Sequence, residues 1–289
     1  MRILAVGIAT LDIINYVSVY PQEDDEVRAV AQRIARGGNA TNTLVALSQL
    51  GHEVAWCGSL ADDDNSRKVL QDLENYQVDC SHVTVQQDAA LPTSYITLSR
   101  LNGSRTIVHY RQLEEYSFAD FVAVDATAYD WIHFEGRNIE QLALMLQHLR
   151  QQGFRKFSLE VEKHRQGIEE LFSLPALLMF SRSYIAEMHN AGVRGFFETL
   201  RQQQIEVPVF CAWGNMGGWA MDAQGKEFQQ PAWQPESVID TLGAGDVFNA
   251  AVIDAHVRGL PVSAGLEFAC RLAGYKCGID GLAGLSGGI

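Results

Sequence analysis

From residue 130 onward, short apolar runs alternate with stretches of helical spacing, and this rhythm constrains the fold more than any other feature. The predicted strands cover residues 131–135, 156–162, 177–181, 207–213 and 217–221, with a short one near Val238 and Ile239. The predicted helices cover residues 139–151, 165–173, 195–204, 244–258 and 262–276. Strands that alternate with helices form a mainly parallel sheet with helices on its faces. We therefore expect an α/β fold.

The first 110 residues follow the same rhythm but contain two interruptions. A strand at 3–9, a helix at 39–50, a strand at 54–58 and a surface helix at 64–76 continue the pattern. The tracts 13–37 and 92–110 are instead predicted as short exposed strands. The second tract has a hairpin signal at Asn102-Gly103, because both residues tolerate positive φ. We expect one domain over residues 1–289, in which these two tracts form a smaller β layer.

The charge balance and the cysteines limit the partners and the location. The chain has 22 Lys and Arg against 35 Asp and Glu, and its net charge of −13 repels nucleic acid and anionic membranes. Five cysteines without a CxxC pair argue against a disulfide framework and fit a reducing, cytoplasmic location. No apolar run reaches the ~18 residues that a membrane-spanning helix needs. We expect no nucleic-acid partner and no membrane partner.

The segment VIDTLGAGDVFNA, residues 238–250, carries the most chemistry. Gly243 and Gly245 stand at the start of a predicted amphipathic helix, so a ligand can approach the free N–H groups of the first turn. Such a helix start is an anion site that suits phosphate. Asp246 has two interpretations. It is either a carboxylate that stabilises the helix start, or a general base that takes a hydroxyl proton while the N–H groups stabilise a transferring phosphoryl group.

Other nucleotide-binding and hydrolytic motifs do not fit. The segment is not a dinucleotide-binding fingerprint, because Phe248 occupies the position of the third small residue. The sequence contains no GxxxxGK[ST], HRD, DFG or HExxH. P-loop NTPases, protein kinases and zincins are therefore excluded.

A second glycine-rich segment, RGGNATN at 36–42, begins another predicted helix. Asn39 and Asn42 are three residues apart and share a helix face. The segment is either a capped tight turn or a pair of amides that bind a polyhydroxy compound. Asp12 and Asp24 are either solvated charges or acceptors for sugar hydroxyls.

Together these segments resemble the ribokinase-like (PfkB) carbohydrate kinases, and within that family most closely the ketohexokinase branch. The resemblance rests on YPQEDDEVR, RGGNATN, GSRTIVHY, HFEGRN, EVEK, CAWG, DTLGAGD and GYKCGIDG, and it covers almost the whole chain. It implies a central sheet flanked by helices, with a β-sheet lid that also forms a homodimer contact. It also implies transfer of the γ-phosphoryl group of ATP, with Mg²⁺, to a sugar hydroxyl, here the 1-hydroxyl of a ketohexose such as fructose.

The resemblance assigns roles by motif position. Asp246 would be the catalytic base, with Gly243, Ala244 and Gly245 forming the anion hole. The sugar would be held by Asp12, Asp24, Gly38, Asn39 and Asn42. The nucleotide would contact Arg105, the loop Gly214, Asn215, Met216 and Gly217, and the pair Cys277 and Gly278.

Two points stay open at the level of sequence. Many members of the family organise Mg²⁺ through an NxxE motif, but the nearest stretch here, SRSYIAE, lacks the Asn. Glu160 and Glu162 are the candidates for direct or indirect metal contacts, the alternative being solvated carboxylates at a strand end. The substrate is also open, because a related kinase for another sugar, a sugar acid or a nucleoside would carry the same motifs. A non-catalytic sugar- or nucleotide-binding regulator on the same fold is the alternative of another class.

Overall fold

A mainly parallel sheet forms the body of the protein, as the strand–helix rhythm predicts. The computed structural model describes residues 1–101, 104–189 and 191–288, and within them the larger sheet has the order β13-β12-β11-β10-β9-β8-β1-β4-β5. Its strands are β1 (Arg2–Val6), β4 (Glu53–Ala61), β5 (Val78–Gln86), β8 (Trp131–Glu135), β9 (Phe157–Val161), β10 (Leu177–Ser181), β11 (Val209–Ala212), β12 (Gly218–Met221) and β13 (Glu227–Gln230). Neighbouring strands from β5 to β11 pair in parallel, whereas β12 and β13 are antiparallel.

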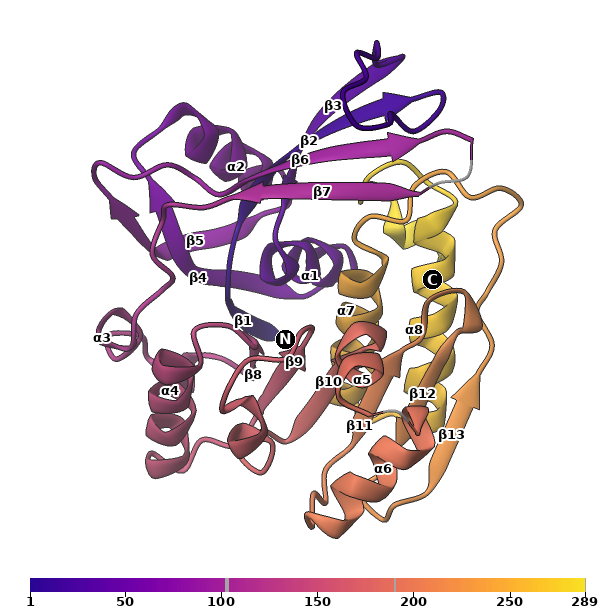
Figure 1. The fold of residues 1–289 in the computed structure, drawn as a ribbon. Coiled ribbons are helices and arrows are strands. Elements are labelled where there is room, and N and C mark those ends of the chain that lie inside the picture. Colours follow the sequence, from indigo (N-terminus) through magenta and orange to yellow (C-terminus); the bar gives the residue numbers. More distant parts are fainter. Residues whose placement is uncertain (102–103, 190, 289) are drawn as a thin grey trace.

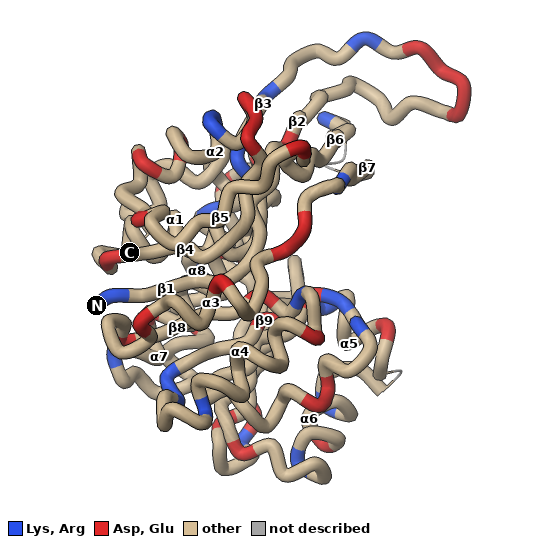
Figure 2. Tube along the Cα trace, turned by 90° about the vertical axis from the view of Figure 1, so that its left-hand side faces the viewer, with Lys and Arg blue, Asp and Glu red and all other residues tan. Residues whose placement is uncertain are grey.

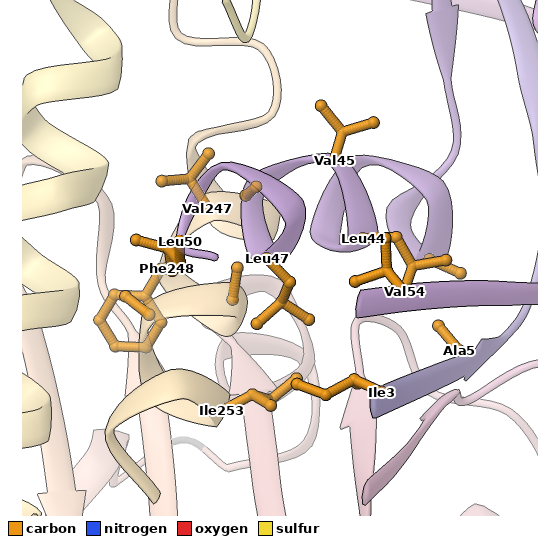
Figure 3. Close-up of a cluster of buried hydrophobic side chains, with 14 of the residues drawn as sticks. Ile3, Ala5, Leu44, Val45, Leu47, Leu50, Val54, Val247, Phe248 and Ile253 are labelled. Carbon is orange, nitrogen blue, oxygen red and sulfur yellow. The ribbon is translucent and has the colours of Figure 1, made fainter. Parts of the chain in front are cut away.

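Helices cover both faces of this sheet. Successive side chains of a strand point to opposite faces, so β1 contributes to two cores. Ile3 and Ala5 lie in the core under α1 (Asn39–Gln49), α2 (Asp64–Asn75), α7 (Ala244–Val257) and α8 (Val262–Cys277). Leu4 and Val6 lie in the core under α3 (Phe118–Phe121), α4 (Ile139–Gln151), α5 (Arg182–Met188) and α6 (Gly192–Gln202). Figure 3 shows the first core, where side chains of α1 and α7 surround Ile3.

The two interrupting tracts form a second, smaller sheet. Its order is β3 (Ala31–Gly37), β2 (Thr10–Val17), β6 (Thr93–Ser99) and β7 (Arg105–Tyr110), and β2 begins earlier than the predicted tract. β6 and β7 pair antiparallel, as the hairpin prediction requires, whereas the turn residues Asn102-Gly103 lie outside the described residues. Figure 1 shows this small sheet above α1 and α7.

Two predicted elements are wrong. The helix expected over 165–173 is only a 3₁₀ turn at Ile168–Leu171, because Gly167 enters it at a φ of 83° and Pro175 follows closely. The strand expected near Val238 and Ile239 does not form. Both side chains are more than half exposed, and the Ile239 N–H donates instead to the Cys277 carbonyl at the end of α8.

Two strands, β5 and β13, were not anticipated because their sequences carry a weak apolar signal. β5 begins with a buried valine, but its remaining residues are partly or fully exposed, and β13 contains no buried residue. Both strands lie at the edges of the sheet, so each pairs with only one neighbouring strand. A strand at an edge can be partly exposed to solvent and does not need a continuous apolar run.

Helix α7 differs from its prediction in a way that matters for function. A single apolar stripe was expected, but every residue from Asp246 to Ala255 is buried. The reason is that α7 packs against both α1 and α8 as well as the sheet. Asp246 and Asn249 are therefore polar groups inside the protein rather than on its surface. Among the described helices, none combines the length and apolarity needed to cross a bilayer.

Candidate active site

The starts of α1 and α7 meet beneath the small sheet. Each helix is preceded by a left-handed glycine, Gly38 with φ 105° and Gly243 with φ 79°, and within the described part of the chain neither helix start has a side-chain cap. A Cβ on Gly38 would lie 2.3 Å from the Ile8 carbonyl oxygen, so only glycine fits this turn. Uncapped first turns leave N–H groups free for a ligand, and the helix dipole favours an anion there.

Asp246 and Asn42 join the two helices. The Asn42 amide donates to Asp246 Oδ2 at 2.7 Å, across 204 residues of sequence. Burial raises the pKa of Asp246 well above its ordinary value, and the nearby charges of Glu135 and Glu162 act in the same direction, while the Asn42 hydrogen bond opposes them. A carboxylate with a raised pKa is a stronger base, which suits removal of a hydroxyl proton near neutral pH.

A cavity of about 660 Å³ opens beside Asp246. Its lining combines predicted sugar-site and catalytic residues from three parts of the chain: Asp12, Gly38, Asn39, Asn42, Gly243 and Asp246. Asp12 reaches it from β2 of the small sheet, opposite the two helix starts. The structure thus brings four of the five predicted sugar-binding residues to one cavity with the candidate base.

Asp24 is the exception. It adopts a φ of 68° in the loop between β2 and β3, where residues 22–30 are exposed, and it does not line the cavity. Figure 2 shows this loop projecting from the molecule with its acidic run in red. Within one chain, the prediction that Asp24 joins Asp12 is therefore wrong, because the acidic run extends the loop into solvent.

A second cavity, of about 350 Å³, lies on the other side of the α7 start. Its lining includes Arg105, Gly214, Asn215, Gly217, Ala244, Gly245 and Cys277, all predicted nucleotide-site or anion-hole residues. Arg105 is held toward the loop before α7, because its Nη1 donates to Thr241 Oγ1 at 3.0 Å. The first turn of α7 therefore separates the two cavities, with Asp246 facing one and Gly245 facing the other.

Two predicted nucleotide-site residues do not line this cavity. Met216 is 59% exposed on its loop. Gly278 ends α8 and packs against Pro235, to which an added Cβ would approach within 2.9 Å. Trp233 and Gly274, which the sequence reasoning missed, line the cavity instead.

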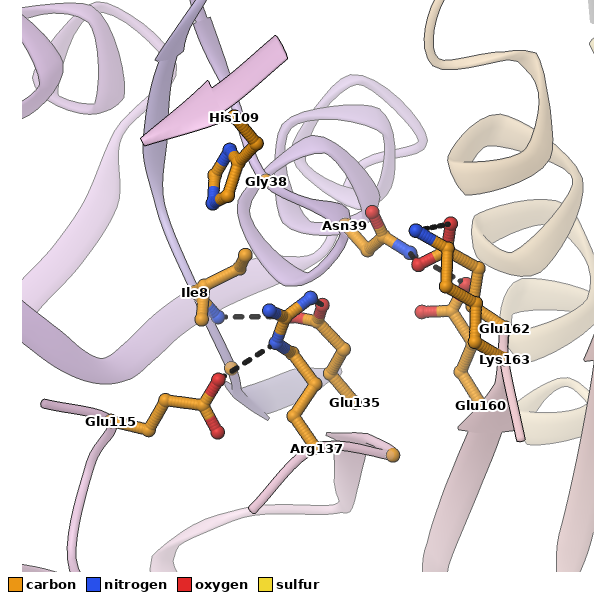
Figure 4. A network of polar contacts seen from close by, with 12 residues as sticks. Ile8, Gly38, Asn39, His109, Glu115, Glu135, Arg137, Glu160, Glu162 and Lys163 are labelled. Carbon is orange, nitrogen blue, oxygen red and sulfur yellow. Dashed lines mark hydrogen bonds and ion pairs between the residues drawn. The ribbon is translucent and has the colours of Figure 1, made fainter. Parts of the chain in front are cut away.

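Glu160 and Glu162 lie together at the end of β9. Asn39 Nδ2 donates to Glu160 Oε1 at 3.1 Å and to Glu162 Oε2 at 3.4 Å (Figure 4). Burial raises the pKa of Glu160 well above its ordinary value, and the charges of Asp246, Glu135 and Glu162 add to that effect. Glu160 Oε2 is buried and has no hydrogen-bond partner among the described residues.

A hard cation would suit these two carboxylates, since it would satisfy the unpartnered oxygen and the surplus negative charge. Among the described residues, however, no group of three His, Cys, Asp or Glu side chains is placed to hold a metal. Mg²⁺ commonly takes one or two carboxylates and completes its shell with water and substrate phosphates. The residues present fit that partial role.

A buried ion cluster supports the loop before α7, and the sequence reasoning missed it. The Lys276 ammonium, fully buried, donates to the Asp240 carbonyl at 2.7 Å and lies 3.0 Å from Asp240 Oδ2. Arg33 of β3 reaches the same carboxylate oxygen at 2.8 Å. Helical spacing offered a signal, because Lys276 lies four and seven residues after the buried Leu272 and Ala269.

Cations also line the first cavity, but the protein itself engages them. The pairs are Arg36 with Asp72 at 2.7 Å, Arg137 with Glu115 at 2.9 Å, Lys163 with Glu162 at 3.7 Å, Arg33 with Asp240 at 2.8 Å, and Arg165 with the Gly136 carbonyl at 3.0 Å. Figure 4 shows Arg137 beside Glu115 and Glu135. Every Lys and Arg among the described residues that line the cavity is therefore already engaged, four by a carboxylate and Arg165 by a carbonyl.

The fold and the site define a ribokinase-like α/β protein built around a glycine-rich helix start and a buried aspartate. Residues 1–283 match the model of the pfkB family carbohydrate kinases. The mouse (Mus musculus) ketohexokinase is 38% identical over 98% of this chain and 98% of its own length. The Bacillus subtilis ribokinase is 24% identical over 94% of this chain and 91% of its own length. The chain belongs to the pfkB family and is a sugar kinase of that family.

Solved structures support the fold. The ribokinase of Arabidopsis thaliana, solved with ribose and ATP, has a TM-score of 0.78 at 17% identity, covering 97% of this chain and 93% of that one. The Burkholderia thailandensis nucleoside kinase, solved with inosine, has a TM-score of 0.79 at 16% identity, covering 99% of this chain and 94% of that one. At these identities the likeness concerns the fold alone. The ribokinase-like fold predicted from the sequence is confirmed.

Proposed function

We propose that this protein is an ATP-dependent kinase that phosphorylates a ketohexose such as fructose at its 1-hydroxyl. The observation that carries the proposal is the first turn of α7, which stands between two cavities with the buried Asp246 on one side. The identity to the mouse ketohexokinase over nearly the whole chain favours a ketohexose. The ribokinase of Bacillus subtilis and the nucleoside kinase of Methanocaldococcus jannaschii mark the alternative substrates within the family.

In this mechanism the sugar occupies the cavity with Asp12, Asn39 and Asn42, and ATP occupies the cavity with Arg105 and Gly245. The sugar hydroxyl donates its proton to Asp246 as it attacks the γ-phosphorus in line with the leaving oxygen. The N–H groups of the first turn of α7 stabilise the charge on the transferring phosphoryl group. Most of the rate enhancement comes from positioning and electrostatics.

Mg²⁺ would be held through Glu160 and Glu162, directly or through water, and would neutralise phosphate charge. Asn39 bridges both carboxylates and thereby links the sugar cavity to the proposed metal contacts. The small sheet serves as the lid of one kinase domain, a proposal supported by the cavity's lining from the small sheet and from the starts of α1 and α7, and by the extent of the family match. The five free thiols support a reducing cytoplasmic location.

The experiment that tests the function is an assay of ATP-dependent ADP release over a panel of ketoses, aldoses, sugar acids and nucleosides. We expect fructose to have the highest kcat/KM, and ¹³C and ³¹P spectra of the product to place the phosphate on the 1-hydroxyl. Preference for a ribose or a nucleoside would assign the chain to another branch of the family. Tight sugar binding without turnover would favour the non-catalytic regulator.

Fructose should be a better substrate than fructose 6-phosphate. The cations that line the sugar cavity are already engaged by protein carboxylates or a carbonyl, and a second phosphate would have to compete for them. Steady-state kinetics with both sugars at saturating ATP measures the difference. A higher kcat/KM for the phosphorylated sugar would contradict the neutral-sugar proposal.

We also propose a twofold homodimer through the small sheet. One row across its outer face is apolar, since Ile34 pairs with Ile13, Ile13 with Tyr95, and Tyr95 with Val108. Ile34, Tyr95 and Val108 are each about half exposed or more, at 50%, 49% and 64%. Ile96 and Leu98 of the same hairpin are buried within the chain against Ile14 and are not available for this contact.

Light scattering at micromolar concentration should therefore give twice the chain mass of 32.0 kDa. Val108→Lys should shift the protein toward monomer, because a charge would enter the apolar row. Leu144→Lys, at a comparably exposed position on α4, is the matched control and should leave the mass unchanged. A monomeric wild type would overturn the dimer.

A further inference from the structure

One row of the small sheet points polar side chains into the sugar cavity. Asp12 of β2 stands opposite Ser94 of β6, and Ser94 stands opposite His109 of β7. Directly opposed residues on neighbouring strands share a face, and all three residues line the cavity. Figure 4 shows the His109 ring extending from β7 toward Ile8 and the Arg137 guanidinium. Only Asp12 of this row was a predicted sugar-binding residue.

The contacts along this row indicate which ring nitrogen carries the proton. Ser94 Oγ lies 3.2 Å from His109 Nδ1, and Ser94 stands directly opposite Asp12 in the strand register. The Ser94 hydroxyl lowers the pKa of the Asp12 carboxyl, against the larger effect of burial, and a hydroxyl that stabilises a carboxylate turns its O–H toward it. In that orientation the serine oxygen accepts from His109 Nδ1–H, which leaves Nε2 without a hydrogen and free to accept. Among the described residues, Nε2 has no hydrogen-bond partner.

The surroundings keep His109 neutral. Burial lowers its pKa below the ordinary histidine value, the cations Arg137, Arg111 and Lys163 act in the same direction, and Asp12 opposes them. These groups face the ring from the segments after β7, β8 and β9 and from β2. A neutral imidazole with its acceptor nitrogen in the cavity suits the hydroxyl of a polyol, which can donate to it.

We propose that His109 is a sugar-binding and specificity-determining residue that accepts a hydrogen bond from a substrate hydroxyl through Nε2, with Ser94 and Asp12 fixing its ring. The inference rests on the proposed sugar kinase function and adds a residue to its substrate site. Asp12 and His109 then offer two acceptors from neighbouring strands of one sheet. A sugar that lacks the matching hydroxyl leaves both unsatisfied, which costs more than the hydrogen bond is worth.

The test uses two substitutions that each keep one half of the imidazole. His109→Asn retains a donor near the Nδ1 position and removes Nε2, whereas His109→Gln retains a polar atom near the Nε2 position. We expect His109→Asn to raise KM for fructose about five- to twenty-fold, with KM for ATP unchanged and kcat within about twofold, as for one lost hydrogen bond to substrate. His109→Gln should raise KM for fructose less than about threefold. Calorimetric titration with fructose should rank the dissociation constants of the two variants in the same order as their KM values.

Ser94→Ala is the second variant, because it frees the ring while keeping Nε2. It should raise KM for fructose by about two- to fivefold, and thermal melting confirms that each variant is folded. The proposal would be overturned if His109→Asn and His109→Gln raised KM for fructose equally, or if His109→Gln raised it more. A parallel rise of KM for ATP would also overturn it. If the wild type does not phosphorylate fructose, the proposed function and this inference both fail. If it does and the variants keep its KM, only the inference fails.

Discussion

Asp246→Asn is expected to lower kcat by about 10²–10⁴-fold, because it removes the group that takes the hydroxyl proton. The amide keeps the size of the carboxylate and can still accept from the Asn42 amide, which now donates to Asp246 Oδ2 at 2.7 Å. The substitution also removes repulsion between the carboxylate and the γ-phosphate. KM for sugar and ATP should therefore change little, as for an interaction made mainly in the transition state.

Steady-state kinetics of the purified variant, with calorimetric titration of both ligands, measures this prediction. Asp254→Asn is a matched control, because Asp254 lies on the same helix and pairs with His52 at 2.8 Å, outside both cavities. It should cost stability and spare kcat. An Asp246→Asn enzyme that keeps more than about a tenth of the wild-type kcat would return Asp246 to the role of a helix-start charge.

The pH profile provides a second readout of the same residue. The pKa of Asp246 is raised, chiefly by burial, and a base works only in its ionised form. The wild-type kcat should thus fall on the acid side at a pH above the ordinary aspartate range. The charge of Asp246 also raises the pKa of Glu160, so the apparent pKa belongs to the two interacting carboxyls. The Asp246→Asn variant should lose this acid limb.

The parts of the fold that could be predicted are those whose signal is local. A buried strand such as β8 or β10 is a continuous apolar run between helical stretches, and each was predicted at its observed bounds. The edge strands β5 and β13 lack such a run because one side faces solvent, and so they were missed. The apolar pair Val238-Ile239 resembled a strand, but whether a short run pairs depends on a free sheet edge nearby.

The same distinction divides the site. Gly38, Gly243 and Asp246 could be predicted because backbone conformation and the helix start are encoded within one short segment. His109 and Arg33 could not, since their partners Ser94 and Asp240 lie on other strands and loops, Asp240 being 207 residues away from Arg33. Asp24 was misplaced for the converse reason. The sequence shows that an acidic residue lies near a predicted site along the chain. Whether its side chain reaches that site depends on the path of the loop in the folded protein.

Lys276→Met is expected to lower the free energy of unfolding by about 3–5 kcal/mol, the usual cost of removing one partner from a buried ion pair. Lys276 is fully buried and Asp240 is 3% exposed, so neither group can turn to water when its partner is lost. The Arg33 guanidinium remains 2.8 Å from Asp240 Oδ2, but the main-chain oxygen of Asp240 loses its donor. Since domains are stable by about 5–15 kcal/mol, this is a large fraction of the total.

Urea unfolding measures the interaction energy between Lys276 and Asp240 apart from the contacts that each makes with other residues. The measurement compares the wild type, Lys276→Met, Asp240→Asn and the double variant. The double variant should lose less than the sum of the two single variants, because it removes both charges of the Lys276–Asp240 pair, while Arg33 keeps its ion pair with Asp280 at 2.5 Å.

Burial opposes ionisation of Asp240, yet Lys276 and Arg33 outweigh it and lower its pKa. The lowered pKa contributes stability that is present above the ordinary aspartate value and is lost as pH falls through the folded value. The gap between wild type and Lys276→Met should therefore narrow on acidification, because a protonated Asp240 no longer needs the ammonium. A gap that stays constant with pH would mean that Lys276 acts through packing of its aliphatic stem.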